Sequence, residues 1–194
     1  MGSNQNIETL LYSVPTLDLA FRQLSELDIF PDCTLICSDN IKIQAHRRYL
    51  CTNSTHFESE FGSEIKKREQ INIDATSNIV IKLLDFLYTF TTDQFQPITD
   101  TKELLRLSNM YNLAQLKARV SGILIGSFTA SNVCELCNFA TLHESQLIRR
   151  AAARFIASNL KEVEEITPNW KKTVGSQIVQ YVQKHLYRQK YPWN

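Results

Sequence analysis

The distribution of strand-forming segments is the feature that most constrains the fold of this chain. Three short runs, 33–37, 41–44 and 71–73, have the composition and alternation of β-strands, and all three lie in the N-terminal half. The turn signal Asp39-Asn40 between the first two predicts a β-hairpin. Three strands are too few to stay folded alone. The sequence therefore predicts an α+β protein in which helices cover a small sheet.

The remaining sequence has the apolar spacing of helices. Predicted helices begin near residues 17, 45, 54, 77, 99, 113, 131, 144 and 176. The helix that begins near 144 is expected to run to 160, and the chain to break around Pro168. Because no strand pattern follows residue 73, we expect an entirely helical C-terminal part.

Composition and charge disfavour several classes of function. Lys and Arg number 21 and Asp and Glu number 20, which leaves a net charge of +1 and no long-range attraction to nucleic acid. Each basic cluster is short and is interpreted as a solvated helix face. The sequence contains neither a membrane-spanning apolar run nor a signal peptide. Five cysteines without a signal peptide favour reduced thiols in the cytoplasm or nucleus.

Motifs for catalysis or metal binding are also missing from the sequence. Cys134-x-x-Cys137 has the spacing of a zinc-ligand pair, but a second pair is lacking, so buried apolar thiols explain it better. The four histidines are scattered, and neither a nucleophile elbow nor a glycine-rich phosphate loop is present. We therefore predict a protein that is not an enzyme and that has no cofactor, no catalytic residue and no metal site.

Several motifs follow one another in the order typical of one family. They are Phe30-Pro31-Asp32-Cys33-Thr34-Leu35, Ala45-His46-Arg47-Arg48-Tyr49-Leu50, Ser54-x-x-Phe57, Phe86-Leu87-Tyr88-Thr89, and Met110-Tyr111-Asn112-Leu113 with Leu116-Lys117. In this series the chain resembles the BTB/POZ family, and specifically the speckle-type POZ protein group. The resemblance implies a small three-stranded sheet flanked by helices and followed by a helical extension.

The likeness continues past the BTB/POZ part. Ala140-x-x-His143 with Leu147, Phe155-Ile156 and Asn169-Trp170-Lys171 resemble the helical extension called the 3-box, the start of a BACK-type region. The resemblance implies an N-terminal arm at 1–15, a BTB/POZ domain at 16–127, a 3-box/BACK-type extension at 128–187 and a tail at 188–194. A MATH domain, which the group usually carries, is not expected in this sequence.

The resemblance also implies a homodimer. Positions matching Leu17, Phe21, Leu24 and Tyr49 face the partner subunit in the family, and the first three share one stripe of the predicted N-terminal helix. The alternative is that this stripe packs on its own domain. Asp32 and Arg47 match a charged pair that many members bury near the dimer interface, and the alternative for this pair is an ordinary surface contact.

A second implied partner is the N-terminal region of cullin-3. Ile65 would be its apolar contact, with Tyr111 on the same side, although Ile65 packing under its own loop is an alternative. The chain departs from the family at two points. Lys67 stands where cullin-binding members often have Glu, and Phe90 follows Tyr88-Thr89 where the family usually has Gly, so that loop is expected to be rebuilt.

Together these features predict a BTB dimerisation module that acts as a substrate adaptor of a cullin-3 RING ubiquitin ligase. The alternative is a scaffold that forms homodimers, or heterodimers with related BTB proteins, without binding cullin. Lys67 favours this alternative. The sequence does not indicate a substrate.

Overall fold

The computed structural model describes residues 31–61, 69–93, 95 and 98–191. The chain divides into two compact units, which meet in sequence between residues 94 and 95 and are described separately below. The predicted helix that begins near residue 17 lies outside the described residues. No helix in the described part of the chain is long and apolar enough to cross a membrane.

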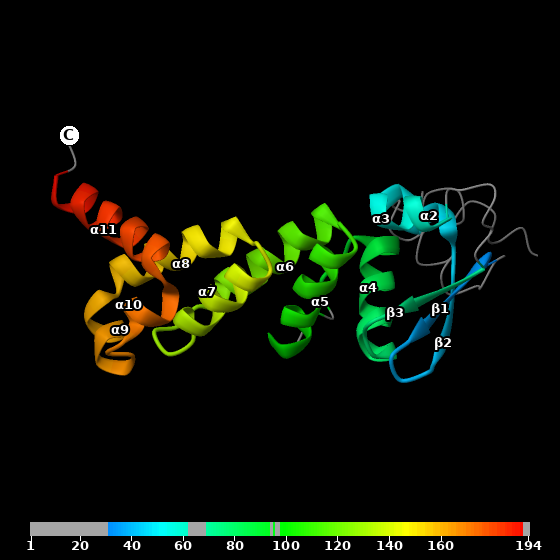
Figure 1. Cartoon of the computed structure of the whole chain (residues 1–194), viewed down its shortest axis with the longest axis horizontal. Helices are drawn as coiled ribbons and strands as arrows, with labels where there is room; N and C mark the ends of the chain where they lie inside the picture. The colour runs from blue at the N-terminus through cyan, green and yellow to red at the C-terminus, as the bar shows by residue number, and fades with distance from the viewer. Residues whose placement is uncertain (1–30, 62–68, 94, 96–97, 192–194) are drawn as a thin grey trace, which may run out of the picture. The chain divides into compact units, whose positions relative to one another are not determined.

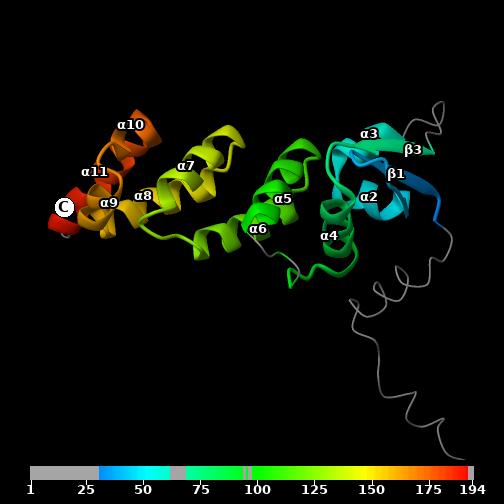
Figure 2. The ribbon, with the colours of Figure 1, turned by 90° about the horizontal axis from the view of Figure 1, so that it is seen from below.

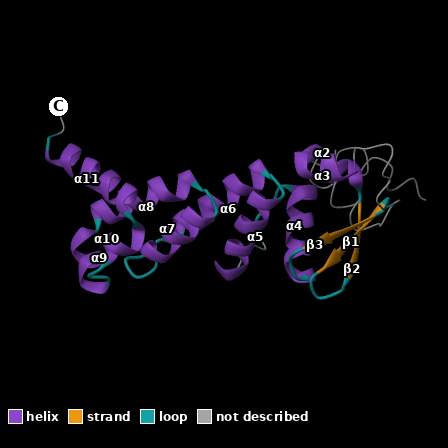
Figure 3. Cartoon of the chain, in the orientation of Figure 1, coloured by secondary structure: helices purple, strands orange, loops and turns teal. Residues whose placement is uncertain are grey.

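The N-terminal unit contains a three-stranded sheet in the order β2-β1-β3. Strand β1 (Cys33–Cys37) is central, β2 (Lys42–Ala45) pairs with it antiparallel, and β3 (Gln70–Ile73) pairs with it parallel. The three predicted strands are therefore confirmed, and Figure 3 shows them together in one unit. The β1–β2 turn contains Asn40 with φ 63°, a conformation that asparagine tolerates.

Among the described residues of this unit, three helices accompany the sheet. They are α2 (Arg47–Asn53), α3 (Thr55–Phe61) and α4 (Ser77–Thr89), and α2 packs against both α3 and α4 while α4 also contacts β2 (Figures 1 and 2). The helix predicted to begin near 45 begins at Arg47 instead. The earlier start was wrong because Ala45 still belongs to β2, where it pairs with Cys33, and His46 is extended.

The end of α4 keeps a helix-stop geometry despite its unusual sequence. Phe90 adopts φ 56° and ψ 17°, the left-handed conformation that glycine favours, and its N–H donates to the carbonyl of Phe86 over 2.7 Å. The Phe90 ring contacts the Phe86 ring edge-on, with centroids 5.7 Å apart. Aromatic packing thus accompanies a backbone conformation that is unfavourable for a residue with a Cβ atom.

The second unit consists of helices, as the sequence predicts. They are α5 (Ile98–Met110), α6 (Ala114–Gly126), α7 (Val133–Leu142), α8 (Gln146–Ser158), α9 (Leu160–Ile166), α10 (Trp170–Val174) and α11 (Ser176–Lys190). Helix α5 packs on α6, α7 on α8, and α8 on α11. The prediction of one helix over 144–160 is wrong, because α8 ends at Ser158 and α9 is a separate helix.

Two helix–helix turns in this unit share one geometry. Asn112 (φ 51°) and Glu144 (φ 52°) are left-handed, and each is followed by a residue whose N–H reaches back into the preceding helix. Leu113 donates to the carbonyl of Ser108, and Ser145 donates to that of Ala140, each over 2.8 Å. This is the hydrogen bond of a Schellman motif, and it fixes the exit of α5 and α7 without a glycine.

A hydrophobic core holds the C-terminal helices together. Trp170 is 2% exposed and is its largest side chain. Its neighbours in this core include Ile156 from α8, Val163 from α9 and Ile178 from α11. The indole N–H also points to the Glu164 carboxylate at 3.4 Å. The core that contains Trp170 therefore draws on α8, α9 and α11.

Replacing this indole should measurably destabilise the second unit. We expect Trp170→Ala to lower the free energy of unfolding by about 3–5 kcal/mol, because the substitution leaves a large cavity. Ile166→Ala, at a position that is 51% exposed, is the matched control and should change it by less than about 0.5 kcal/mol. Denaturant unfolding followed by circular dichroism measures both. Equal effects of the two substitutions would contradict the assigned core.

Candidate functional site

The candidate interaction site is built where β1 and α2 begin. The N–H of Asp32 donates to the carbonyl of Ala45 over 3.1 Å, which extends the β1–β2 ladder by one residue. The Asp32 carboxylate accepts the backbone N–H of Arg47 over 2.7 Å. Because the residue that precedes α2, His46, supplies no side-chain cap, Asp32 caps this helix from the neighbouring strand.

Arg47 completes this link with its side chain. Its Nε donates to the carbonyl oxygen of Asp32 over 3.0 Å, and its guanidinium carbon lies 5.5 Å from the centre of the Phe61 ring. Asp32 and Arg47, the predicted charged pair, are therefore in contact. Each of the two hydrogen bonds joins the side chain of one residue to a backbone group of the other. Asp32 is exposed and Arg47 half-buried, so water screens much of their attraction and the contact orients the chain more than it stabilises it.

Three aromatic side chains pack beside this link. The rings of His46, Tyr49 and Tyr88 meet edge-on in pairs, with centroids 5.1 to 5.9 Å apart. The Tyr88 hydroxyl accepts the backbone N–H of His46 over 3.1 Å and lies 2.9 Å from Nδ1 of the same residue. Since the hydroxyl has a single proton, it donates to Nδ1 when the His46 ring carries its proton on Nε2.

Burial controls the proton affinities in this region. Tyr88 is 3% exposed, and burial raises the pKa of its hydroxyl to about 12. Burial also raises the pKa of the Cys33 thiol to about 12, with the nearby Asp32 charge acting in the same direction. Both groups are therefore neutral around pH 7, and Cys33 lacks the thiolate that a nucleophile requires.

The second unit provides no better chemical site. Burial raises the pKa of Cys137 to about 11 and also raises that of Cys134, and both side chains lie in the core around Trp170. Among the described residues, no group of three or more His, Cys, Asp or Glu side chains is placed to hold a metal ion.

The structure describes only some of the residues predicted to contact partners. Leu17, Phe21, Leu24 and Ile65 lie outside the described residues. Tyr49 is half-buried and packs in the aromatic cluster. Tyr111 belongs to the second unit and is 4% exposed, so its side chain offers little contact area to a partner.

Sequence reasoning missed the parts played by His46 and Tyr88. Both stand in motifs that were identified, namely Ala45-His46-Arg47 and Phe86-Leu87-Tyr88-Thr89. Their pairing links α4 to the start of α2 across a long sequence separation, and a single sequence contains no signal for such a contact. The predicted anchor Tyr49 is therefore held in place by two residues that had no predicted role.

The small sheet and the helices that pack with it define a small α+β domain. A family model described as "BTB/POZ domain" matches residues 21–127, more than half of the chain. The chain belongs to the BTB/POZ domain family. Domains of this family mediate association between proteins, generally by forming dimers, and their members are typically adaptors or scaffolds and not enzymes.

Curated relatives share this region at low identity. The chain is 28% identical over 153 residues to BTB and MATH domain-containing protein 42 of Caenorhabditis elegans, which covers 77% of this chain and 37% of the relative. It is 26% identical over 153 residues to TD and POZ domain-containing protein 5 of Mus musculus, over 77% of this chain and 44% of the relative. It is also 26% identical over 147 residues to BTB/POZ and TAZ domain-containing protein 2 of Arabidopsis thaliana, over 72% of this chain and 40% of the relative. The chain therefore spans less than half the length of each.

Removing the Tyr88 hydroxyl should expose its structural role. We expect Tyr88→Phe to cost about 1–3 kcal/mol of stability, because it leaves the His46 N–H without this acceptor. Tyr187→Phe, at an exposed position, is the control and should cost less than about 0.5 kcal/mol. Denaturant unfolding at several pH values measures both.

The stability of the parent protein and that of Tyr88→Phe should also differ in how they depend on pH. Because the folded-state pKa of Tyr88 lies above its ordinary value of 10.0, this contribution to stability is complete below pH 10 and is lost as the pH rises toward 12. Cys33 adds a loss of the same sign that begins near its ordinary value of 9.0. Tyr88→Phe should therefore lose stability less steeply above pH 10 than the parent, and identical slopes would contradict this assignment.

Proposed function

We propose that this chain is a BTB dimerisation module of the speckle-type POZ group that adapts substrates to a cullin-3 RING ubiquitin ligase. The observation that carries the proposal is the arrangement around Arg47. This residue contacts Asp32, just after the segment with the proposed dimer anchors, and Phe61, just before the segment with Ile65. The two described contacts of Arg47 thus lie close in sequence to both proposed partner-binding segments.

The proposed dimer uses Leu17, Phe21, Leu24 and Tyr49. Burying the first three is worth roughly 5–9 kcal/mol in one subunit, whereas association costs on the order of 4–15 kcal/mol. A two-fold interface uses each anchor twice, which brings the total to roughly 10–18 kcal/mol, enough to offset most or all of this cost. The edge contact between Tyr49 and Tyr88 supports this proposal, because a ring that is already held loses little freedom on binding.

The proposed cullin surface centres on Ile65, with Lys67 beside it. Glutamate is frequent in cullin-binding relatives at the position of Lys67, so this residue reverses a charge. At the rim of an interface such a reversal mainly slows association, and in its centre it costs more. Tyr111, the other residue predicted for this surface, is 4% exposed within the second unit and would not contact cullin directly.

The proposed domain organisation follows the same resemblance. The BTB/POZ domain would occupy 16–127, and α7 to α11 would form the 3-box/BACK-type extension over 128–187. The printed names of two relatives include a MATH and a TAZ domain in addition to the BTB domain. In this chain, substrate binding within the given sequence would use the N-terminal arm, the segment from Thr89 to Ile98 or the tail from Tyr187 to Trp193.

Lys67 favours a second candidate function. In this alternative the chain forms homodimers, or heterodimers with related BTB proteins, and does not engage a ligase. Such a subunit would reduce the ligase activity of a full-length relative by occupying one half of its dimer. The two functions share the dimer interface and differ only at the cullin surface.

Solution mass tests the dimer. The chain is expected to elute with twice its 22.4 kDa mass in light-scattering chromatography, and Leu17→Asp combined with Leu24→Asp should give a single subunit. Ile81→Asp replaces a side chain that is 52% exposed on α4 and serves as the matched control, which should remain dimeric. A parent protein that stays a single subunit at high concentration would contradict both candidate functions.

Binding of the purified cullin-3 N-terminal region separates the candidates. An adaptor should bind it, Ile65→Asp should abolish binding, and Lys67→Glu should strengthen it by about tenfold, the effect of one good charge contact at an interface. Lys172→Glu makes the same change of charge at an exposed position of α10 and should leave the affinity unchanged. Calorimetry measures each constant. If the chain is a dimer but does not bind cullin at micromolar concentration, the result supports the alternative function, a scaffold without ligase contact.

A further inference from the structure

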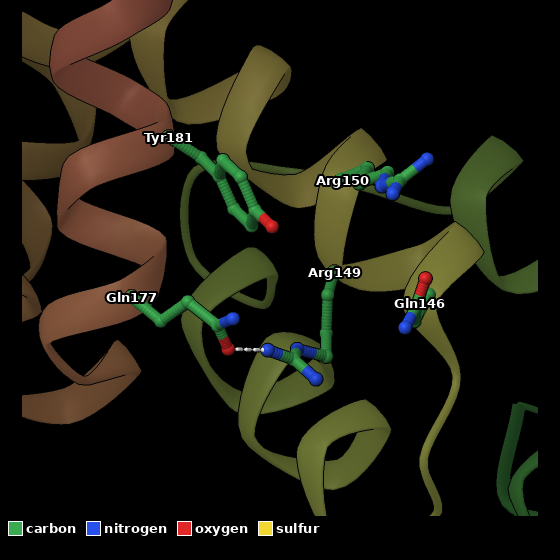
Figure 4. Close-up of a pocket in the computed structure, with 5 residues that line it drawn as sticks. All are labelled: Gln146, Arg149, Arg150, Gln177 and Tyr181. Carbon is green, nitrogen blue, oxygen red and sulfur yellow. Dashed lines mark hydrogen bonds between the residues drawn. The ribbon is translucent and has the colours of Figure 1, made fainter.

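The second unit contains a small polar pocket between α8 and α11. Gln146, Arg149 and Arg150 line it from α8, and Gln177 and Tyr181 line it from α11 (Figure 4). Its cavity volume is about 30 Å³. This is below the roughly 300–1,000 Å³ of small-molecule sites, so the pocket suits one chemical group and not a nucleotide or a cofactor.

The lining groups are predominantly donors and carry positive charge. The two guanidinium groups have no acceptor atoms, and the lining contains no carboxylate. Arg149 and Gln177 point toward each other across the pocket, where Nη2 of Arg149 donates to Oε1 of Gln177 (Figure 4). Nε of Arg149 is buried and has no hydrogen-bond partner among the described residues. An anionic oxygen could accept a hydrogen bond from this unsatisfied donor.

The two helices extend the positive charge beyond the pocket. On α8, Arg154 follows Arg150 by one helical turn. On α11, Lys184 and Arg188 lie on the same face of the helix as Gln177 and Tyr181. The pKa of the His185 imidazole is lowered, first by burial and then by the charges of Arg154, Arg188 and Lys184. These three charges therefore lie near His185. We call Arg150, Arg154, Lys184 and Arg188 the basic strip.

The basic strip has not been neutralised by the protein itself. Among the described residues, no ion pair involves Arg149 or any member of the strip, whereas Lys102 and Arg106 of α5 each pair with a glutamate. Helices α8 and α11 pack against each other directly, so the strip and the pocket lie on the same pair of helices within a single unit, and Arg150 belongs to both. A row of positive charges that ends in a pocket for one anionic group fits an extended chain of acidic side chains.

We propose that the α8–α11 surface binds an acidic peptide segment of a partner protein, with one carboxylate held by Arg149 in the pocket and further acidic side chains along the basic strip. In the bound state the carboxylate takes both Nε and Nη2 of Arg149, and the Gln177 amide turns so that its NH₂ group donates. This inference does not depend on cullin binding, because none of the residues proposed for the cullin surface belongs to it.

Fluorescence anisotropy with the full chain tests this surface. The probe is a short labelled peptide of alternating glutamate and serine, and the control probe replaces every glutamate with glutamine. The glutamate peptide should bind and the glutamine peptide should not. Arg149→Lys keeps the charge but removes the forked geometry, and we expect it to weaken binding by about tenfold.

A pair of charge-matched variants distinguishes the basic strip from net charge. Arg150→Glu with Arg154→Glu should abolish binding, since both positions face the strip. Lys161→Glu with Lys172→Glu produces the same change of net charge at exposed positions of α9 and α10 and should change affinity by no more than about twofold. Arg150 and Arg154 contribute no core contact, so this comparison decides the matter even if Arg149→Lys disturbs folding.

Three results would overturn the proposal. They are equal binding of the glutamate and glutamine peptides, equal weakening by the two charge-matched variants, and binding to phosphatidylserine vesicles or to polyuridine without binding to the glutamate peptide. The last result would assign the surface to a lipid or a nucleic acid instead. Unchanged cullin binding in the Arg150→Glu, Arg154→Glu variant would confirm that the two surfaces act separately.

Discussion

The N-terminal unit depends on the backbone pairing of β1 with a neighbour on each side. Leu35 lies opposite Ile43 of β2 and Ile71 of β3, so this strand has no free edge along its pairing length. Its residues alternate in burial, with Cys33, Leu35 and Cys37 in the core. Because Asp32 continues the same strand and caps α2, the position of β1 also sets the start of that helix. The candidate site is thus an extension of the sheet.

Sequence alone predicted the fold class and the strands because both depend on local pattern. It did not predict the parallel pairing of β3, since register has no local signal. It also misplaced the start of α2 and missed the separation of α8 from α9. Left-handed residues stop α4, α5 and α7, yet they are Phe90, Asn112 and Glu144 and not glycine. The glycine signal that normally marks such ends is therefore missing at these three positions. Helices α8 and α9 are separated differently, at Asn159, which is not left-handed (φ −123°).

The candidate site was predicted in part. The family motifs led to Asp32, Arg47 and Tyr49, and the structure places the first two in contact and the third in an aromatic cluster. What the motifs did not provide was the physical reason for these residues. Asp32 acts as a helix cap, and His46 and Tyr88 hold Tyr49. Such parts depend on contacts between distant segments, which become visible only when the chain is folded.

The net charge of +1 does not describe how charge is distributed over the folded chain. Read along the sequence, each basic cluster is short and is compatible with a solvated helix face. Folding changes this interpretation, because the packing of α8 on α11 adds the charges of two separate clusters on one surface while the acidic residues of α9 do not pair with them. Like charges brought together by folding reduce stability unless a ligand neutralises them. The basic strip lowers the stability of the fold and has no internal counter-charge. Its presence is therefore better explained by ligand binding than by a contribution to stability.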